Sequence, residues 1–122
     1  MTRYKKDLGH RGEIEAINYL RKKGYQILKQ NFHTHWGEID IIALKETKLS
    51  FFEVKTRRNE SFGKPFEAVN STKVRRLMRP IQYFLLQNNY KNYKLSLDVI
   101  SIVLNSDLTV KSLKHFANVG AN

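Results

Sequence analysis

The chain has 122 residues, of which 41% are hydrophobic, and this is enough to form one domain with a buried core. It contains no cysteine, no run near the roughly 20 apolar residues of a membrane span, and no apolar segment behind its basic N-terminus. These features predict a cytoplasmic protein without a membrane anchor, with one domain over residues 1–117 and a flexible tail over 118–122. The net charge of +11 favours a polyanionic partner, most often nucleic acid.

The first half of the chain predicts one helix and three strands. Apolar residues at helical spacing indicate a helix over Leu8–Lys23, which Gly24 would end, and Glu13 falls on its apolar face. Tyr25–Asn31 is expected to be a short strand, followed by a turn at Phe32–His35. Residues 36–44 and 49–57 then alternate as two further strands.

The second half predicts a helix between a polar loop and two strands. Breakers mark a loop over Asn59–Pro65, and Ser71 or Thr72 can cap a helix that extends to about Asn88. Pro80 should kink or split that helix. Strands over Lys94–Leu104 and Leu108–Phe116 complete an α/β fold, a mixed central sheet flanked by helices.

Two acids stand inside the apolar runs of the predicted hairpin. The four residues at 45–48 allow a closure in which paired positions sum to 93. The pairs on one face would then be Leu44–Leu49, Ile42–Phe51, Asp40–Glu53 and Glu38–Lys55. Like charges directly opposite each other destabilise a sheet unless a cation or shared proton lies between them. Two acids and a lysine on adjacent strands are suited to bind a divalent cation and activate water for phosphodiester cleavage.

Several stretches resemble a known family over nearly the whole chain. They are Gly9–Glu13 with Ala16, Gly24–Leu28 with Asn31, Gly37–Ala43, Phe51–Arg57, Glu67–Val69 with Lys73 and Arg76, and Asp98–Ile100. They are similar to the YraN-like family, within the PD-(D/E)xK superfamily of nucleases. The resemblance implies a core like that of restriction endonucleases and Holliday-junction resolvases.

The resemblance also implies a role for each matching residue. Asp40 and Glu53 would bind Mg²⁺ or Mn²⁺, and Glu13 would complete the metal shell. Lys55 would position or help to deprotonate the attacking water. Glu38 is not assigned by the resemblance; it is either the counter-ion of Lys55 or, as we prefer, a residue that orients the site. DNA, in preference to RNA, would be the substrate, and a homodimer is an expectation because many such nucleases are dimers. Residues placed for phosphate contact are Arg57, Arg58, Lys73 and Arg76.

Plainer interpretations accompany several of these residues. Lys55 could be only the counter-ion of Glu38, and Asp98 is expected to have a structural role. His33 and His35 lack a third ligand nearby, so a zinc site is not expected there. Trp36 is expected in the core, with base stacking as the alternative. At the level of the whole protein, the alternatives to a nuclease are a non-catalytic nucleic-acid-binding module and an RNA-directed or ribosome-associated basic protein.

Overall fold

The computed structural model describes residues 3–58 and 71–119. The elements in chain order are α1 (Arg3–Lys22), β1 (Gln26–Thr34), β2 (Gly37–Lys45), β3 (Lys48–Arg57), α2 (Ser71–Gln87), β4 (Lys94–Leu104) and β5 (Val110–Phe116). They form one sheet in the order β1-β2-β3-β4-β5. Among the described strands only β3 and β4 run parallel, and α2 lies in the connection between them. The predicted α/β class, with a mixed sheet flanked by helices, is confirmed, and it is compatible with a restriction-endonuclease-like core.

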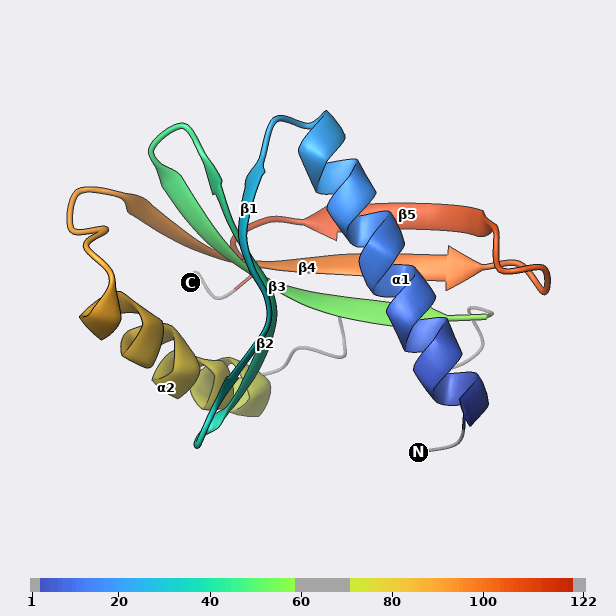
Figure 1. Cartoon of the computed structure of the whole chain (residues 1–122), viewed down its shortest axis with the longest axis horizontal. Coiled ribbons are helices and arrows are strands. Elements are labelled where there is room, and N and C mark those ends of the chain that lie inside the picture. The colour runs from blue at the N-terminus through green and yellow to red at the C-terminus, as the bar shows by residue number, and fades with distance from the viewer. Residues whose placement is uncertain (1–2, 59–70, 120–122) are drawn as a thin grey trace.

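The two helices lie on opposite faces of this sheet (Figure 1). On one face α1 contributes Ala16, Ile17 and Leu20 to a core that includes Phe52 and Ile100. On the other face α2 packs through a second set of buried residues, which are Leu77, Ile81, Phe84, Phe51 and Leu97. Because the central strands are covered on both faces, they have nearly continuous apolar runs. Within the described residues, no helix is both long and apolar enough to span a membrane.

A close approach at Gly12 positions α1 on the sheet. Gly12 is buried, and a Cβ placed on it would come within 1.8 Å of the hydroxyl oxygen of Thr56 on β3. Only glycine therefore allows the helix to lie this near the strand. The contact places the next residue, Glu13, at the carboxyl end of β3.

The segment before the hairpin differs from its prediction. β1 continues to Thr34 and does not end at Asn31, so the turn is formed by His35 and Trp36. Asn31 has a φ of 49°, in the left-handed region that asparagine tolerates better than most residues. The strand continues past this irregular residue. Local turn propensity alone does not predict this continuation.

Helix α2 also differs, because it runs through Pro80 as a single element. The expectation that Pro80 would split it is wrong. Pro80 is buried and lies against the β1–β2 turn, since a Cβ on Gly37 would be 3.9 Å from its Cγ. Packing against that turn offsets the loss of one helical hydrogen bond.

Both ends of the second half can be compared with their predictions only in part. The expected loop at Asn59–Pro65 lies outside the described residues, as do positions 120–122 of the expected tail. The first two tail residues are bound to β4. The N–H of Asn118 donates to the Asp98 carboxylate at 3.0 Å, and that of Val119 donates to the Leu97 carbonyl at 2.7 Å.

Candidate active site at the fork between β2 and β3

The β2–β3 ladder has the predicted register but is shorter than predicted. Its pairs run from Lys45–Lys48 to Ile41–Phe52, and every pair sums to 93. Beyond Phe52, β3 continues to pair with β4 as far as Arg57–Val103, whereas β2 turns away with β1 (Figure 1). Two-stranded ribbons twist strongly, and this separates β2 from the flatter half of the sheet. The predicted direct pairs Asp40–Glu53 and Glu38–Lys55 are therefore not part of the ladder.

Asp40 lies at the point where the two strands diverge. The main-chain N–H of Val54 donates to its Oδ2 at 2.8 Å, in the place of the next rung of the ladder. Ile39 and Ile42, three residues apart, both belong to the core under α2, so strict alternation fails across Asp40. The left-handed Asn31 lies between the residues that pair with Ile39 and Ile41. Irregular strand geometry of this kind re-aims a side chain, here toward the free edge of β3.

Other acids surround Asp40. Burial and the charge of Glu53, with smaller effects from Glu13 and Glu38, raise the pKa of Asp40 to about 7 even though the Val54 hydrogen bond opposes the shift. These acids come from three different elements: α1, β2 and β3. The fork therefore has an excess of negative charge that a cation would relieve.

Glu53 is the acid of this group that already has cationic partners. It is only 8% exposed, and its Oε1 lies 2.7 Å from Nζ of Lys73 and 3.4 Å from Nζ of Lys55. A buried carboxylate needs such partners. The interpretation of Lys55 as a counter-ion of Glu38 is wrong, because Glu38 instead pairs with His33 at 3.2 Å, across β1 and β2.

The two lysines differ in their affinity for protons. Burial and the neighbouring Lys73 lower the pKa of Lys55 below the ordinary value for a lysine, although Glu53 opposes this. Burial also disfavours protonated Lys73, but hydrogen bonds to Glu53 and Lys55 and the charges of Glu53 and Asp40 raise its pKa. Lys55 is therefore the lysine of this pair that gives up its proton more readily.

Glu13 approaches the fork from α1. Burial and the charge of Glu38 raise its pKa, and a hydrogen bond with Asn31 and the charge of His10 act in the opposite direction. The structure thus places Glu13 near Asn31 and Glu38. The sequence pattern did not indicate that Asn31 would lie next to Glu13. It also did not indicate that Lys73, 20 residues after Glu53, would pair with that acid.

The remaining predicted phosphate contacts are distributed around the site. Arg76 is exposed on α2. Arg58 is exposed just after β3, where it is not without an interaction partner. Arg57 is half-buried, and among the described residues its Nε has no hydrogen-bond partner. Lys73 faces Glu53.

The acids at the fork only partly meet the requirements of a divalent cation. In the part of the chain that the structure describes, no three His, Asp or Glu side chains are gathered closely enough to bind one metal ion. The donors themselves are hard carboxylate oxygens, which suit Mg²⁺ or Mn²⁺, and the crowding around Asp40 favours a cation. The ammonium of Lys73 now occupies the cation position at Glu53. Asp40 and Glu53 fit the ion if Glu53 exchanges Lys73 for it, and Glu13 would have to move closer to them to complete the donor set.

Asp98 forms a separate cluster on the α1 face. It is fully buried and accepts hydrogen bonds from Ser96, from the main chain of Asn118 and from Nε2 of His115, the last at 2.7 Å. Burial opposes ionisation, but these hydrogen bonds hold the pKa of Asp98 below its usual range. The cluster ties β5 to β4, in agreement with the expected structural role.

The surface near the β1–β2 turn carries His35 and Trp36 of the turn and His33 of β1. Trp36 is 46% exposed, so the expectation that it belongs to the core is wrong. His33 faces Glu38, and the rings of His35 and Trp36 form a T-shaped contact with centroids 5.7 Å apart.

Comparison with known proteins places these residues in a family context. The model of the uncharacterised protein family UPF0102 matches residues 12–102. A UPF0102 protein of Caldanaerobacter subterraneus is 42% identical over 93% of this chain and 94% of its own length. A UPF0102 protein of Clostridium perfringens strain 13 is 43% identical over 88% of each chain, and one of Clostridium acetobutylicum is 39% identical over 97% of each.

Proposed function

The chain belongs to the UPF0102, or YraN-like, family, and we propose that it is a metal-dependent nuclease that hydrolyses phosphodiester bonds in DNA. The single observation that carries the proposal is the position of Asp40 at the fork, with its Oδ2 bound to the N–H of Val54 and with Glu53 beside it. Acids held this close together destabilise the fold, so their presence favours a functional explanation.

Asp40, Glu53 and Glu13 are the residues that would hold Mg²⁺ or Mn²⁺. The ion, when bound, would polarise the phosphate and lower the pKa of a coordinated water. The hydrogen bond from Val54 orients the carboxylate of Asp40 and leaves its second oxygen for a ligand. Glu38 is paired with His33, and its negative charge acts on Asp40 and Glu13. It would therefore help to orient the metal site without being a metal ligand.

Lys55 is suited to the proton transfer. Hydrolysis forms a bond between a water oxygen and phosphorus, breaks one of the two ester P–O bonds, and releases a proton from the water. Burial, Lys73 and Glu53 set the proton affinity of Lys55, and its lowered pKa makes the neutral amine that would accept this proton easier to form. The oxygen of the broken bond takes a proton from solvent.

The positive charge of the rest of the molecule would hold the polynucleotide. The net charge of the protein is +11, which would attract a polynucleotide. The exposed Arg58 and Arg76 would contact phosphates without reading the base sequence. We expect single-stranded, flapped or branched DNA among the substrates.

The test is cleavage of labelled single-stranded, duplex, flapped and branched DNA with Mg²⁺ or Mn²⁺, with EDTA and a matched RNA panel as controls. The nuclease proposal predicts cutting of at least one DNA structure that EDTA abolishes. Salt-sensitive DNA binding without cleavage under any condition would favour the non-catalytic module. Preferred binding to structured RNA would favour the RNA-directed alternative.

A further inference from the structure

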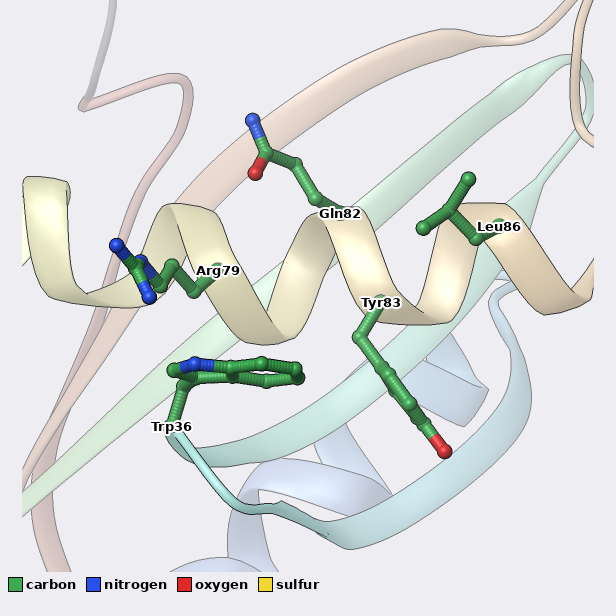
Figure 2. A pocket seen from close by; sticks show the side chains of 5 residues that line it. All are labelled: Trp36, Arg79, Gln82, Tyr83 and Leu86. Carbon is green, nitrogen blue, oxygen red and sulfur yellow. The ribbon is translucent and has the colours of Figure 1, made fainter.

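A groove between helix α2 and the β1–β2 turn has no part in the chemistry described above. It has a volume of about 310 Å³ and is lined by Trp36, Arg79, Gln82, Tyr83 and Leu86 (Figure 2). The four α2 residues recur at spacings of three and four, so they form one stripe on the helix surface. This stripe is separate from the buried face of α2, which contains Leu77, Ile81 and Phe84.

The aromatic side chains of the groove are held in place yet accessible. The Trp36 ring lies beside α2, with Arg79 to one side and Tyr83 to the other in Figure 2. The Trp36 and Tyr83 ring centroids are 5.9 Å apart, and Phe32 supports Tyr83 from the sheet at 6.2 Å. The main-chain N–H of Trp36 donates to Oγ1 of Thr34 at 3.1 Å, which fixes the backbone of the turn.

A row of cations connects this groove with the candidate active site. Lys73, at Glu53, is followed by the exposed Arg76 and Arg79 in steps of three residues, so that successive side chains are neighbours on the helix. From Lys73 to Tyr83 the helix rises about 15 Å, at 1.5 Å per residue. A stacked strand covers that distance in about four nucleotides, at 3.4 Å per nucleotide.

We propose that the Trp36–Tyr83 groove binds unpaired bases of a DNA strand whose backbone follows Lys73, Arg76 and Arg79 to the site of cleavage. This inference rests on the proposed function and narrows its substrate to DNA with a single-stranded segment beside the scissile bond. Paired bases have both faces covered by their neighbours in a duplex, whereas unpaired bases stack on aromatic rings whatever their sequence. The cations beside the groove match the charge of a polynucleotide strand.

Trp36 is the single tryptophan in the sequence, so its fluorescence reports on the groove directly. The experiment titrates the protein, without metal, with a 12-nucleotide dT strand, a hairpin duplex of equal charge, and a 12-unit abasic strand that has phosphates but no bases. The proposal predicts strong quenching by the dT strand and little quenching by the other two. The quenching experiment involves no cleavage. A negative quenching result therefore counts against the groove proposal, whereas a negative cleavage assay counts against the nuclease proposal.

Variants complete the test. Tyr83→Ala should weaken dT binding about tenfold, and Arg79→Gln should weaken it while leaving the fold intact. Val110→Ala serves as the matched control, because Val110 is a partly exposed apolar residue on β5, at the opposite edge of the sheet, and should change nothing. Equal quenching by the abasic strand, or unchanged dT binding by both groove variants, would overturn the proposal. Concentration-dependent burial of Trp36 in a dimer that Leu86→Glu dissociates would also overturn it, by identifying the groove as an interface between copies of the chain.

Discussion

The carboxylate of Asp40 accepts the main-chain N–H of Val54 at 2.8 Å, just beyond Ile41–Phe52, the last pair of the β2–β3 hairpin. A side chain thus replaces a rung of the ladder where the strands separate. This contact fixes an acid beside Glu53 at the opening of the fork.

Asp40→Asn should stabilise the metal-free protein at neutral pH. The folded-state pKa of about 7 lies above the ordinary value of 3.8, so the folded state binds more protons and wild-type stability falls as pH rises from about 4 through 7. Asparagine does not titrate, and its oxygen can still accept the N–H of Val54. Thermal unfolding should show a gain of about 4 kcal/mol at pH 8, the free-energy equivalent of this pKa shift, and almost none at pH 4. A variant that is less stable than wild type at pH 8 would contradict the crowding of acids at the fork.

Gly12→Ala should destabilise the fold, because the new methyl group would collide with Thr56 and push α1 away from β3. We expect a loss of about 2 kcal/mol or more in chemical denaturation. Gly9→Ala is the matched control in the same helix, since a Cβ there meets nothing within 4 Å and alanine is the better helix former. It should be neutral or slightly stabilising. Equal effects of the two substitutions would show that α1 is not seated on Thr56.

Lys73→Ala should strengthen metal binding if Lys73 and the ion compete for Glu53. Removing the ammonium 2.7 Å from Oε1 leaves that carboxylate available. Calorimetric titration with Mn²⁺ should show an affinity several-fold higher than in wild type, in line with an ion pair worth about 1 kcal/mol. Arg75→Ala, an exposed position two residues along α2, is the control and should leave the affinity unchanged. Weaker binding by Lys73→Ala would instead mean that Lys73 supports the site.

Asp98→Asn should reduce stability without acting through the fork. Asp98 is fully buried with three hydrogen-bond donors, and one of them is His115 on β5. We expect a loss of about 2–4 kcal/mol at pH 7. Because the folded-state pKa is depressed, this contribution is present above pH 4 and is lost as the pH falls through the folded value, so the variant and wild type should converge in acid.

The exposed Asp107 provides the control for this pH series, because its pKa is also lowered, by Thr109, but outside the core. Asp107→Asn should change the denaturation midpoint little at any pH. A similar loss of stability in Asp98→Asn and Asp107→Asn would contradict the claim that the buried Asp98 cluster stabilises the fold.

The sequence predicted the strand register because an even-numbered loop between two apolar runs allows one favourable pairing, and the five observed pairs have it. It could not predict the fork, because the choice of β4 as the lasting partner of β3 depends on contacts made far along the chain. For the same reason Lys73 was expected at a phosphate, whereas the packing of α2 places it at Glu53. Trp36 was expected in the core on hydrophobicity alone, and Pro80 was expected to break a helix that tertiary contacts maintain.

The most direct test of the central claim compares DNA cleavage by wild type, Asp40→Asn and Glu15→Gln with Mn²⁺, with binding measured in parallel. Glu15 is the matched acid, since it lies on α1 and is paired with Arg11 at 2.9 Å. A metal-activated site at the fork predicts that Asp40→Asn loses cleavage by at least a hundredfold while it still binds DNA, and that Glu15→Gln cleaves like wild type. Equal cleavage by Asp40→Asn and wild type would contradict the account.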